Sequence, residues 1–232
     1  MARSYDCSVE ADLLTGLRIA RVSLGRDELV VLPTDTVYGI ACDAFSEAGV
    51  KALLATKGRG PQSPPPVLIA NQATLLALAE EVPQVGLDLA EKFWPGALTL
   101  IVHARSSLNW NLGETKGTVA LRIPDQKITL SLLEEVGPLA VSSANLTGQA
   151  AATNVKQAIS YFDDKVAVYL DAGESPSGEA STILDLTDVQ DDFDAEGKPV
   201  THGKVRVVRV GAISIDKIRV VAKDLLDESS VQ

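Results

Sequence analysis

Four short polar clusters contain the residue types that bind phosphates and other anions. They are residues 33–39 (PTDTVYG), 57–59 (KGR), 122–125 (RIPD) and 142–145 (SSAN). Each lies where a regular element is predicted to end. Ligands bind at strand ends in open α/β sheets, because side chains and free backbone groups from several strands converge there. The cations and hydroxyls of the four clusters therefore predict a site for an anionic, phosphate-bearing ligand.

Taken one at a time, the clusters also have ordinary structural explanations. Asp35 and its flanking threonines could simply satisfy the backbone of a turn, and so could residues 142–145. Lys57 and Arg59 could be surface cations that the dipole of the preceding helix favours. Arg122 could pair with Asp125 or another acidic neighbour. No single cluster decides between these explanations and a ligand site.

The elements that must position these clusters alternate between strands and helices. Helical spacing or capping residues predict helices at 11–24, 47–56, 73–80, 85–93, 128–136 and 154–162. Short apolar runs predict strands at 29–32, 67–69, 98–102, 118–123, 139–141, 166–170, 181–186 and 204–210. This alternation is typical of an α/β fold in which helices cover both faces of the sheet.

The composition indicates one well-buried globular domain. The chain has 232 residues, 46% of them hydrophobic and 22% charged, and no low-complexity linker divides it. We expect one domain over residues 1–220 and a frayed tail over residues 221–232. The start lacks a signal peptide, and no apolar run approaches the roughly 20 residues that span a bilayer. We therefore expect a cytoplasmic protein without a membrane segment.

Charge and rare residues exclude several classes of function. The net charge of -10 weighs against tight, nonspecific binding of nucleic acid, which needs cations to neutralise phosphates. Cys7 and Cys42 are too few for a disulfide framework or a cysteine-rich zinc site. His103 and His202, the two histidines, have no nucleophile-like Ser or Cys nearby, which weighs against a Ser-His-Asp or Cys-His enzyme. P-loop, GxGxxG and HExxH motifs are absent.

In their order along the chain, the four clusters resemble the YrdC/Sua5 family of threonylcarbamoyl-AMP synthases. That family has a PTDTVYG-like segment, a K-x-R motif and an S-x-N motif, and the resemblance runs from residue 29 to residue 213. It implies a twisted, open mixed α/β sheet with helices packed around it and a concave, electropositive ligand cavity. Because the chain ends shortly after residue 213, it looks like the single-domain form of the family.

The resemblance also implies which residues bind the substrates. Lys57 and Arg59 match the K-x-R pair that binds ATP phosphates and stabilises the leaving pyrophosphate, so they are the expected catalytic residues. The expected contacts to threonine or bicarbonate are Thr36, Tyr38, Arg122, Ser143 and Ser181. The other expected ATP contacts are Ser63, Thr118, Asn145, Thr153 and Arg209. Ser63 stands where the family has Asn or Lys, and Val210 replaces a family Pro after Arg209.

The reaction implied by the resemblance joins L-threonine, bicarbonate and ATP into L-threonylcarbamoyl-AMP and pyrophosphate. This is the first step of N6-threonylcarbamoyladenosine formation in tRNA, and a downstream transferase machinery would use the product. Mg²⁺ is expected with ATP, held mainly by phosphate oxygens and water rather than by protein ligands. Direct tRNA binding should be weak or absent. Two alternatives stay open: a non-catalytic RNA-binding module, and a hydrolase or carbamoyl-group transferase of the same fold.

Overall fold

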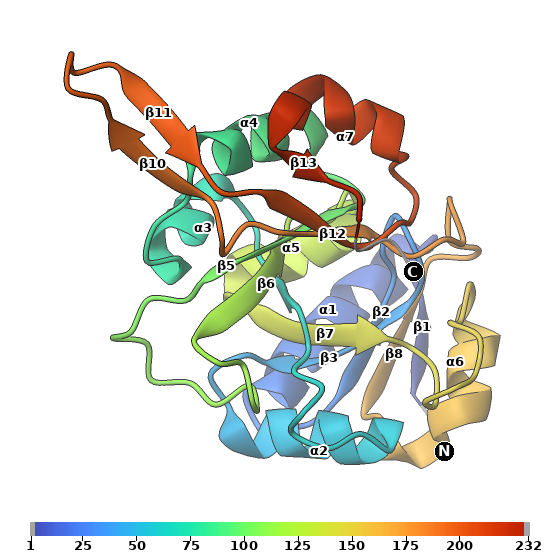
Figure 1. Cartoon of the computed structure of the whole chain (residues 1–232). Coiled ribbons are helices and arrows are strands. Elements are labelled where there is room, and N and C mark those ends of the chain that lie inside the picture. The colour runs from blue at the N-terminus through green and yellow to red at the C-terminus, as the bar shows by residue number, and fades with distance from the viewer. Residues whose placement is uncertain (1–2, 230–232) are drawn as a thin grey trace.

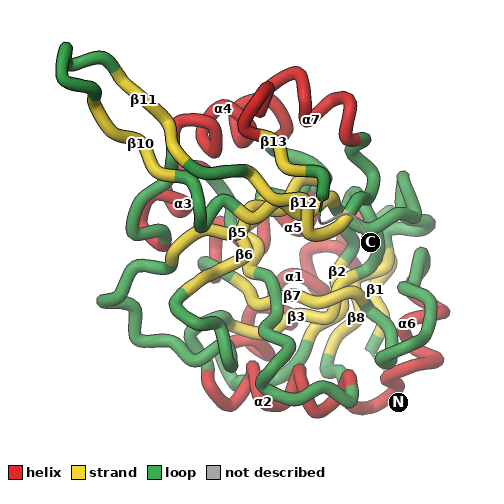
Figure 2. The backbone as a smooth tube through the Cα atoms, in the orientation of Figure 1, coloured by secondary structure: helices red, strands yellow, loops and turns green. Residues whose placement is uncertain are grey.

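An eleven-stranded mixed sheet organises the chain in the computed structural model, which describes residues 3–229 (Figures 1 and 2). The strand order is β1-β8-β2-β3-β7-β4-β6-β5-β9-β12-β13. Parallel and antiparallel neighbours are equally common in this sheet. The strands are β1 Ser4–Asp6, β2 Val30–Leu32, β3 Gly39–Asp43, β4 Val67–Leu68, β5 Leu98–His103, β6 Thr118–Arg122, β7 Leu139–Ser143, β8 Val168–Asp171, β9 Thr182–Asp185, β12 Val205–Arg209 and β13 Leu226–Asp227.

Helices pack around the sheet, and one hairpin projects from it (Figure 1). The helices are α1 Glu10–Leu24, α2 Glu47–Lys57, α3 Gln72–Leu78, α4 Gln84–Phe93, α5 Lys127–Val136, α6 Val155–Phe162 and α7 Ile215–Ala222, with short 3-10 turns η1 Asp163–Lys165 and η2 Lys223–Leu225. The hairpin pairs β10 Gln190–Phe193 with β11 Pro199–His202. No helix within residues 3–229 combines the length and the apolar character needed to cross a membrane.

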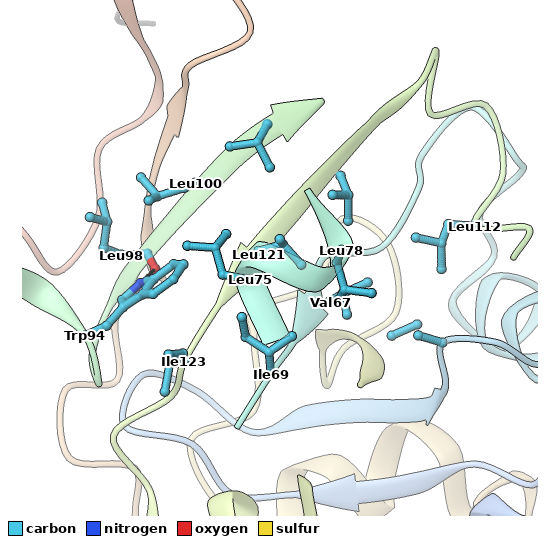
Figure 3. Close-up of a cluster of buried hydrophobic side chains, with 14 of the residues drawn as sticks. Val67, Ile69, Leu75, Leu78, Trp94, Leu98, Leu100, Leu112, Leu121 and Ile123 are labelled. Atoms are coloured by element: carbon cyan, nitrogen blue, oxygen red, sulfur yellow. Dashed lines mark hydrogen bonds between the residues drawn. The ribbon is translucent and has the colours of Figure 1, made fainter. Parts of the chain in front are cut away.

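Two hydrophobic cores lie on the two faces of the sheet. Alternate residues of β2 point to opposite faces, so Val30 and Leu32 pack into one core and Val31 into the other. The first core lies under α1 and α5, which contact each other. The second lies under α2, α3, α4 and α6 and includes the cluster drawn in Figure 3, where Trp94 packs beside leucines of β5. Burial on both faces explains the nearly continuous apolar character of the central strands.

Local sequence signals explain where several helices begin. Ser46 accepts a hydrogen bond from the Gly49 amide at the start of α2, and Asn71 accepts one from the Thr74 amide at the start of α3. The predicted N-cap at Asn71 is therefore confirmed. Side-chain caps of this kind stabilise a helix by about 1 kcal/mol each. Each of the six predicted helices and eight predicted strands has a counterpart in the structure, with ends shifted by a few residues at most.

The sequence analysis does not predict several elements, because their stability depends on strands or helices that are far away in the sequence. β3 begins at a glycine and contains Ala41 and Cys42, which are poor signals for a strand. It forms because β2 pairs with it on one side and β7 on the other. β1 likewise pairs with β8. The sequence analysis also lacks the β10–β11 hairpin, α7 and β13.

The expectation of a frayed tail from residue 221 is wrong for the residues that the structure describes. Val221 and Ala222 complete α7, and Leu226–Asp227 forms β13, which pairs in parallel with β12. Ile218 and Ala222 are buried, and α7 contacts α4. The abundance of charged residues in this segment conceals that small apolar face. Residues 230–232 of the expected tail lie outside the described residues.

Candidate active site

A cavity of about 340 Å³ lies against the central strands and receives side chains from segments far apart in the sequence. This volume falls within the range of small-molecule sites. Eight of the twelve predicted site residues line it: Thr36, Tyr38, Arg59, Thr118, Arg122, Ser143, Ser181 and Arg209. The other four, Lys57, Ser63, Asn145 and Thr153, lie outside the lining. The structure therefore brings most of the predicted residues to one cavity and places four of them outside its lining.

The segment after β2 is held by a chain of hydroxyl hydrogen bonds. Thr34 Oγ1 donates to the carbonyl of Val37 (2.7 Å) and receives the backbone amide of Thr36 (3.1 Å). Because the Thr34 proton is used there, the 2.8 Å contact between the two hydroxyls has Thr36 as its donor. Both threonines are nearly fully buried. This is the turn chemistry expected of Thr-Asp-Thr, and it also forms one wall of the cavity.

The Tyr38 hydroxyl is hydrogen-bonded to the backbone of the 172–173 loop. It donates to the carbonyl of Gly173 (2.7 Å) and accepts from the amide of Ala172 (2.9 Å). Burial raises the pKa of Tyr38 to about 12, so the hydroxyl stays protonated. The polar tip proposed as a ligand contact is therefore engaged with the 172–173 loop, and Tyr38 connects that loop to β3.

Arg122 is held in place by Asp35. The guanidinium pairs with the Asp35 carboxylate and donates to Thr36 Oγ1 and to the carbonyl of Gly96, both at 2.9 Å. The two charged side chains are only 7% and 13% exposed, so the pair is largely desolvated. Asp125, the partner weighed in the sequence analysis, contributes only its backbone amide to Asp35 (3.1 Å). Arg122 still has N–H groups left for a ligand, because a guanidinium has five.

Arg59 is the cation with the weakest attachments to the protein at this site. It donates to Thr147 Oγ1 and to Ser142 Oγ, each at the long distance of 3.3 Å. It follows Gly58, which ends α2 in the left-handed conformation that glycine adopts without strain. Most of its planar fork is therefore available to a bidentate anion such as a phosphate.

Lys57 lies behind the cavity wall and does not face the cavity. It is 1% exposed, and its ammonium donates to the carbonyl of Ser143 and to the carbonyl (2.8 Å) and side-chain oxygen (3.2 Å) of Asn145. The side-chain amide of Asn145 donates hydrogen bonds to the carbonyls of Leu146 and Gln149. The S-x-N turn is thus fixed from inside by Lys57, and neither Lys57 nor Asn145 has a donor directed at the ligand space.

The buried position of Lys57 predicts a pH dependence of stability. Burial, and secondarily the charge of Arg59, lowers the pKa of Lys57 to about 7. In the unfolded chain the lysine pKa is about 10.4. Between these values the unfolded state binds more protons than the folded state, so Lys57 makes stability rise as pH increases from about 7 to 10. In urea unfolding from pH 6 to 10, Lys57→Met should show a smaller rise than the parent protein, and equal slopes would contradict the shift.

Ser142 and Ser143 differ in whether the hydroxyl proton is already used within the protein. Ser143 Oγ donates to Asn145 Oδ1 (2.6 Å), which uses its proton within the turn. Ser142, which the sequence analysis does not assign to the site, lines the cavity and accepts the long bond from Arg59. Its proton has no acceptor among the described residues. Ser142 is therefore better placed than Ser143 to donate to a ligand bound at Arg59.

Arg209 faces the cavity because β12 contains a bulge. The register with β9 shifts between Val207 and Arg209, which leaves Val208 as an extra residue. In a regular strand Arg209 would share the buried face of Val205 and Val207. The bulge reverses the alternation, so Val208 and Arg209 both line the cavity.

Arg209, Ser181 and Thr99 form one hydrogen-bonded group on the wall made by β5, β9 and β12. Arg209 donates to the carbonyl of Ser181 through Nε (3.0 Å) and Nη2 (2.8 Å), and Nη2 lies 3.2 Å from Ser181 Oγ. Ser181 Oγ is 2.8 Å from Thr99 Oγ1. Thr99 is missing from the sequence prediction, since a threonine inside an apolar strand run looks like an ordinary β-former.

Three other predicted ATP contacts, Thr118, Thr153 and Ser63, form hydrogen bonds with residues close to them in the sequence. The Thr118 hydroxyl donates to the carbonyl of Thr115 (2.8 Å) at the cavity rim. Thr153 binds the side chain of Gln157 through its amide (2.8 Å) and lies outside the cavity lining. Ser63 lies in a turn, in which its backbone amide donates a hydrogen bond to the carbonyl of Gly60 (3.2 Å). Thr153 and Ser63 therefore do not face the cavity in this arrangement.

The cavity is positive although the chain is acidic. Arg59, Arg122 and Arg209 line it, and no acidic side chain is among the described lining residues. The nearby acid Asp35 is already paired with Arg122. A cavity with low-dielectric walls and one sign of charge concentrates the field and attracts anions. The geometry thus supports an anionic ligand of small-molecule size.

The comparisons with known proteins agree with this geometry. The Sua5/YciO/YrdC family model, described as "Telomere recombination", matches residues 23–193. A Mycobacterium leprae protein, provisionally named threonylcarbamoyl-AMP synthase, is 44% identical over 218 residues, which cover 94% of this chain and 93% of that protein. The Bacillus subtilis threonylcarbamoyl-AMP synthase is 34% identical over 202 residues, which cover 85% of this chain and 57% of that protein.

A solved structure extends the likeness to the fold. Pyrococcus abyssi Sua5 complexed with L-threonine superposes with a TM-score of 0.83 and 29% identity, covering all of this chain and 62% of that one. The chain belongs to the Sua5/YciO/YrdC family, and the YrdC-like sheet and the family resemblance predicted from the sequence are confirmed.

Proposed function

We propose that the protein is an L-threonylcarbamoyladenylate synthase, an ATP-dependent nucleotidyltransferase. It would convert L-threonine, bicarbonate and ATP into L-threonylcarbamoyl-AMP and pyrophosphate for the modification of tRNA. The observation that carries the proposal is the positive cavity, which combines three arginines with several buried hydroxyls. The names of the relatives and the threonine complex of P. abyssi Sua5 support the substrate assignment.

The proposed reaction needs positioning and charge stabilisation more than a covalent nucleophile. The amine of threonine attacks the carbon of bicarbonate, and a carbamate forms as the C–O bond to the hydroxyl breaks and water leaves. The carbamate carboxylate then attacks the α-phosphate of ATP, and pyrophosphate leaves as the bond between the α- and β-phosphates breaks. Arg59 and Ser142 would hold the phosphates, because their donors are the least used by the protein. The developing negative charge would then fall beside the Arg59 guanidinium. Arg122 would orient the amino acid at the other wall.

Lys57 would act in this scheme as a positioning residue. Its ammonium holds the backbone of Ser143 and Asn145, and it sits two residues before Arg59 on the same helix end. Loss of Lys57 would therefore disturb both the turn and the adjacent cation. Mg²⁺ would enter with ATP and take its ligands from phosphate oxygens and water, since the described residues lining the cavity supply hydroxyls and no carboxylate.

The proposed function is tested by omission of each substrate. Pyrophosphate should form only when ATP, L-threonine and bicarbonate are all present, and each omission should reduce the rate to background. Mg²⁺ chelation should do the same. Pyrophosphate release that does not depend on threonine would contradict the synthase assignment and favour the hydrolase or carbamoyl-group transferase considered above.

The non-catalytic RNA-binding module predicts a different result. Phosphate binding along an RNA backbone requires exposed cations, yet the arginines of this site lie around a small cavity in a chain of net charge -10. ATP and threonine should raise the melting temperature saturably, whereas tRNA should bind weakly and lose affinity steeply with salt. Tight tRNA binding at physiological salt without stabilisation by ATP would favour the binding module. The downstream transferase and the cytoplasmic location stay predictions.

A further inference from the structure

The direction of the Arg59 side chain depends mainly on where the backbone places its Cα atom. Both side-chain hydrogen bonds are long, at 3.3 Å, so they constrain the guanidinium only weakly. On one side α2 fixes the backbone, because the Arg59 amide donates to the carbonyl of Leu54 at 2.8 Å. On the other side lie residues 60–66, which include four prolines without an amide hydrogen. This segment therefore has few donors of its own to hold its position.

The loop between β5 and β6, residues 104–117, supplies a partner for the segment that follows Arg59. The Glu114 amide of this loop donates to the carbonyl of Pro61 at 2.7 Å. Within residues 3–229 it is the one backbone hydrogen bond that joins residues 60–63 to another segment. The loop also contributes Leu112 and Thr115 to the cavity lining, and Leu112 belongs to the buried cluster drawn in Figure 3. The β5–β6 loop thus supports both the Arg59 segment and part of the cavity wall.

Gly113 lies where the β5–β6 loop comes closest to that segment. Its φ is +104°, in the left-handed region that favours glycine. A Cβ atom at this position would lie 2.5 Å from the carbonyl oxygen of Pro61, which is too close for any side chain. The obstacle is backbone, so it cannot rotate away as the end of a flexible side chain can. Glycine at position 113 therefore permits the hydrogen bond between Glu114 and Pro61.

The β5–β6 loop is anchored at its other side by the start of α2 (Figure 1). The rings of Trp110 and Phe45 lie with their centroids 5.4 Å apart. Asn111 Nδ2 donates to Glu47 Oε1 (3.3 Å), and Asn111 Oδ1 accepts from the Gly113 amide (3.2 Å). The loop therefore connects the beginning of α2 with the segment that follows its end.

We propose that Gly113 is a positioning residue for Arg59. By letting the β5–β6 loop pack against Pro61, it sets the direction in which Arg59 meets the phosphates of the nucleotide. This inference rests on the proposed function. A displacement of about 1 Å in a catalytic group can lower a rate by roughly a hundredfold, so a small shift of Pro61 is sufficient. Arg122 is held separately by Asp35, so amino-acid binding should not change.

The experiment compares two glycines of the β5–β6 loop. Gly113→Ala should lower ATP-dependent pyrophosphate formation by roughly tenfold to a hundredfold, with the KM for L-threonine within about twofold of the parent value. Gly117→Ala is the matched control, because Gly117 also has a left-handed φ of +78° but a Cβ there meets nothing within 4 Å. The control should lose stability through backbone strain but change the rate by no more than about twofold.

A double-mutant cycle with Arg59→Ala tests the route of the effect. In the Arg59→Ala background, Gly113→Ala should lower the rate by no more than about twofold further, because no guanidinium remains to be misplaced. Inorganic pyrophosphate provides a readout that does not depend on turnover. It should raise the melting temperature of the parent saturably, and Gly113→Ala should need roughly tenfold more of it. Stabilisation by L-threonine should be the same in both proteins.

The outcomes separate the positioning role from a general loss of structure. Multiplied effects in the double variant, or an equal rate loss in Gly117→Ala, would overturn the proposal. If Gly113→Ala melts below the assay temperature, Asn111→Ala removes the bond to Glu47 and should give the same pattern with a loss of roughly threefold to tenfold. A parent protein without threonine-dependent pyrophosphate release would contradict the proposed function, whereas the pyrophosphate-binding comparison would still test the positioning of Arg59.

Discussion

Arg59→Ala is expected to lower ATP-dependent pyrophosphate formation by about two to three orders of magnitude in a protein that stays folded. Removal of one preorganised donor that stabilises transition-state charge typically has an effect of this size. The fold should survive because the two hydrogen bonds of Arg59 to the protein are long, at 3.3 Å. Steady-state kinetics with thermal melting measure both parts of this prediction.

Two matched variants define the role of Arg59. Arg59→Lys should recover only part of the rate, because it keeps the charge but loses the planar fork that grips two phosphate oxygens. Arg18→Ala, an exposed change on α1, removes a charge of the same sign and should have no effect on turnover. Unchanged turnover in Arg59→Ala would remove this residue from the catalytic assignment.

Asp35→Ala is expected to destabilise the protein by about 3–5 kcal/mol. The change leaves the Arg122 guanidinium buried without its partner, and breaking a desolvated ion pair from one side has a cost of this order. Urea unfolding at neutral pH measures the effect. A loss below about 1 kcal/mol would mean that the pair behaves like an exposed surface pair.

The double variant Asp35→Ala with Arg122→Met separates two effects on stability: the cost of burying an unpaired charge and the loss of the ion-pair contact itself. Its stability should return toward that of the parent, because replacing a whole buried ion pair by apolar groups is often neutral. Its activity should not return, since Arg122 is the expected partner of the threonine carboxylate. In Arg122→Met alone, the KM for threonine should rise more than the KM for ATP, and equal changes would make Arg122 purely structural.

The sequence by itself determined most of the framework of this protein. Helical periodicity, short apolar runs and caps such as Asn71 are local signals, so the main helices and strands follow from them. The order of the polar clusters was sufficient to indicate the family and the region of the cavity. The positions of Arg59 and Arg122 at the ends of predicted elements made them candidates for binding an anion.

Tertiary structure decided which of those side chains face the ligand space. Lys57 and Arg59 are two residues apart, yet Lys57 turns inward to the carbonyls of Ser143 and Asn145, a partnership between segments about 86 residues apart. The pairing of Asp35 with Arg122 spans a similar distance along the chain. No local pattern encodes such contacts, because they depend on how strands are ordered in the sheet.

The same reason explains the residues that the sequence analysis missed. Thr99 meets Ser181 only when β5 and β9 become neighbours, and Ser142 meets Arg59 only when the end of α2 is placed beside β7. The bulge at Val208 reverses the face that Arg209 occupies, against the simple alternation of a strand. Sequence determines which groups are present, whereas the sheet register determines which of their protons and charges remain free for a ligand.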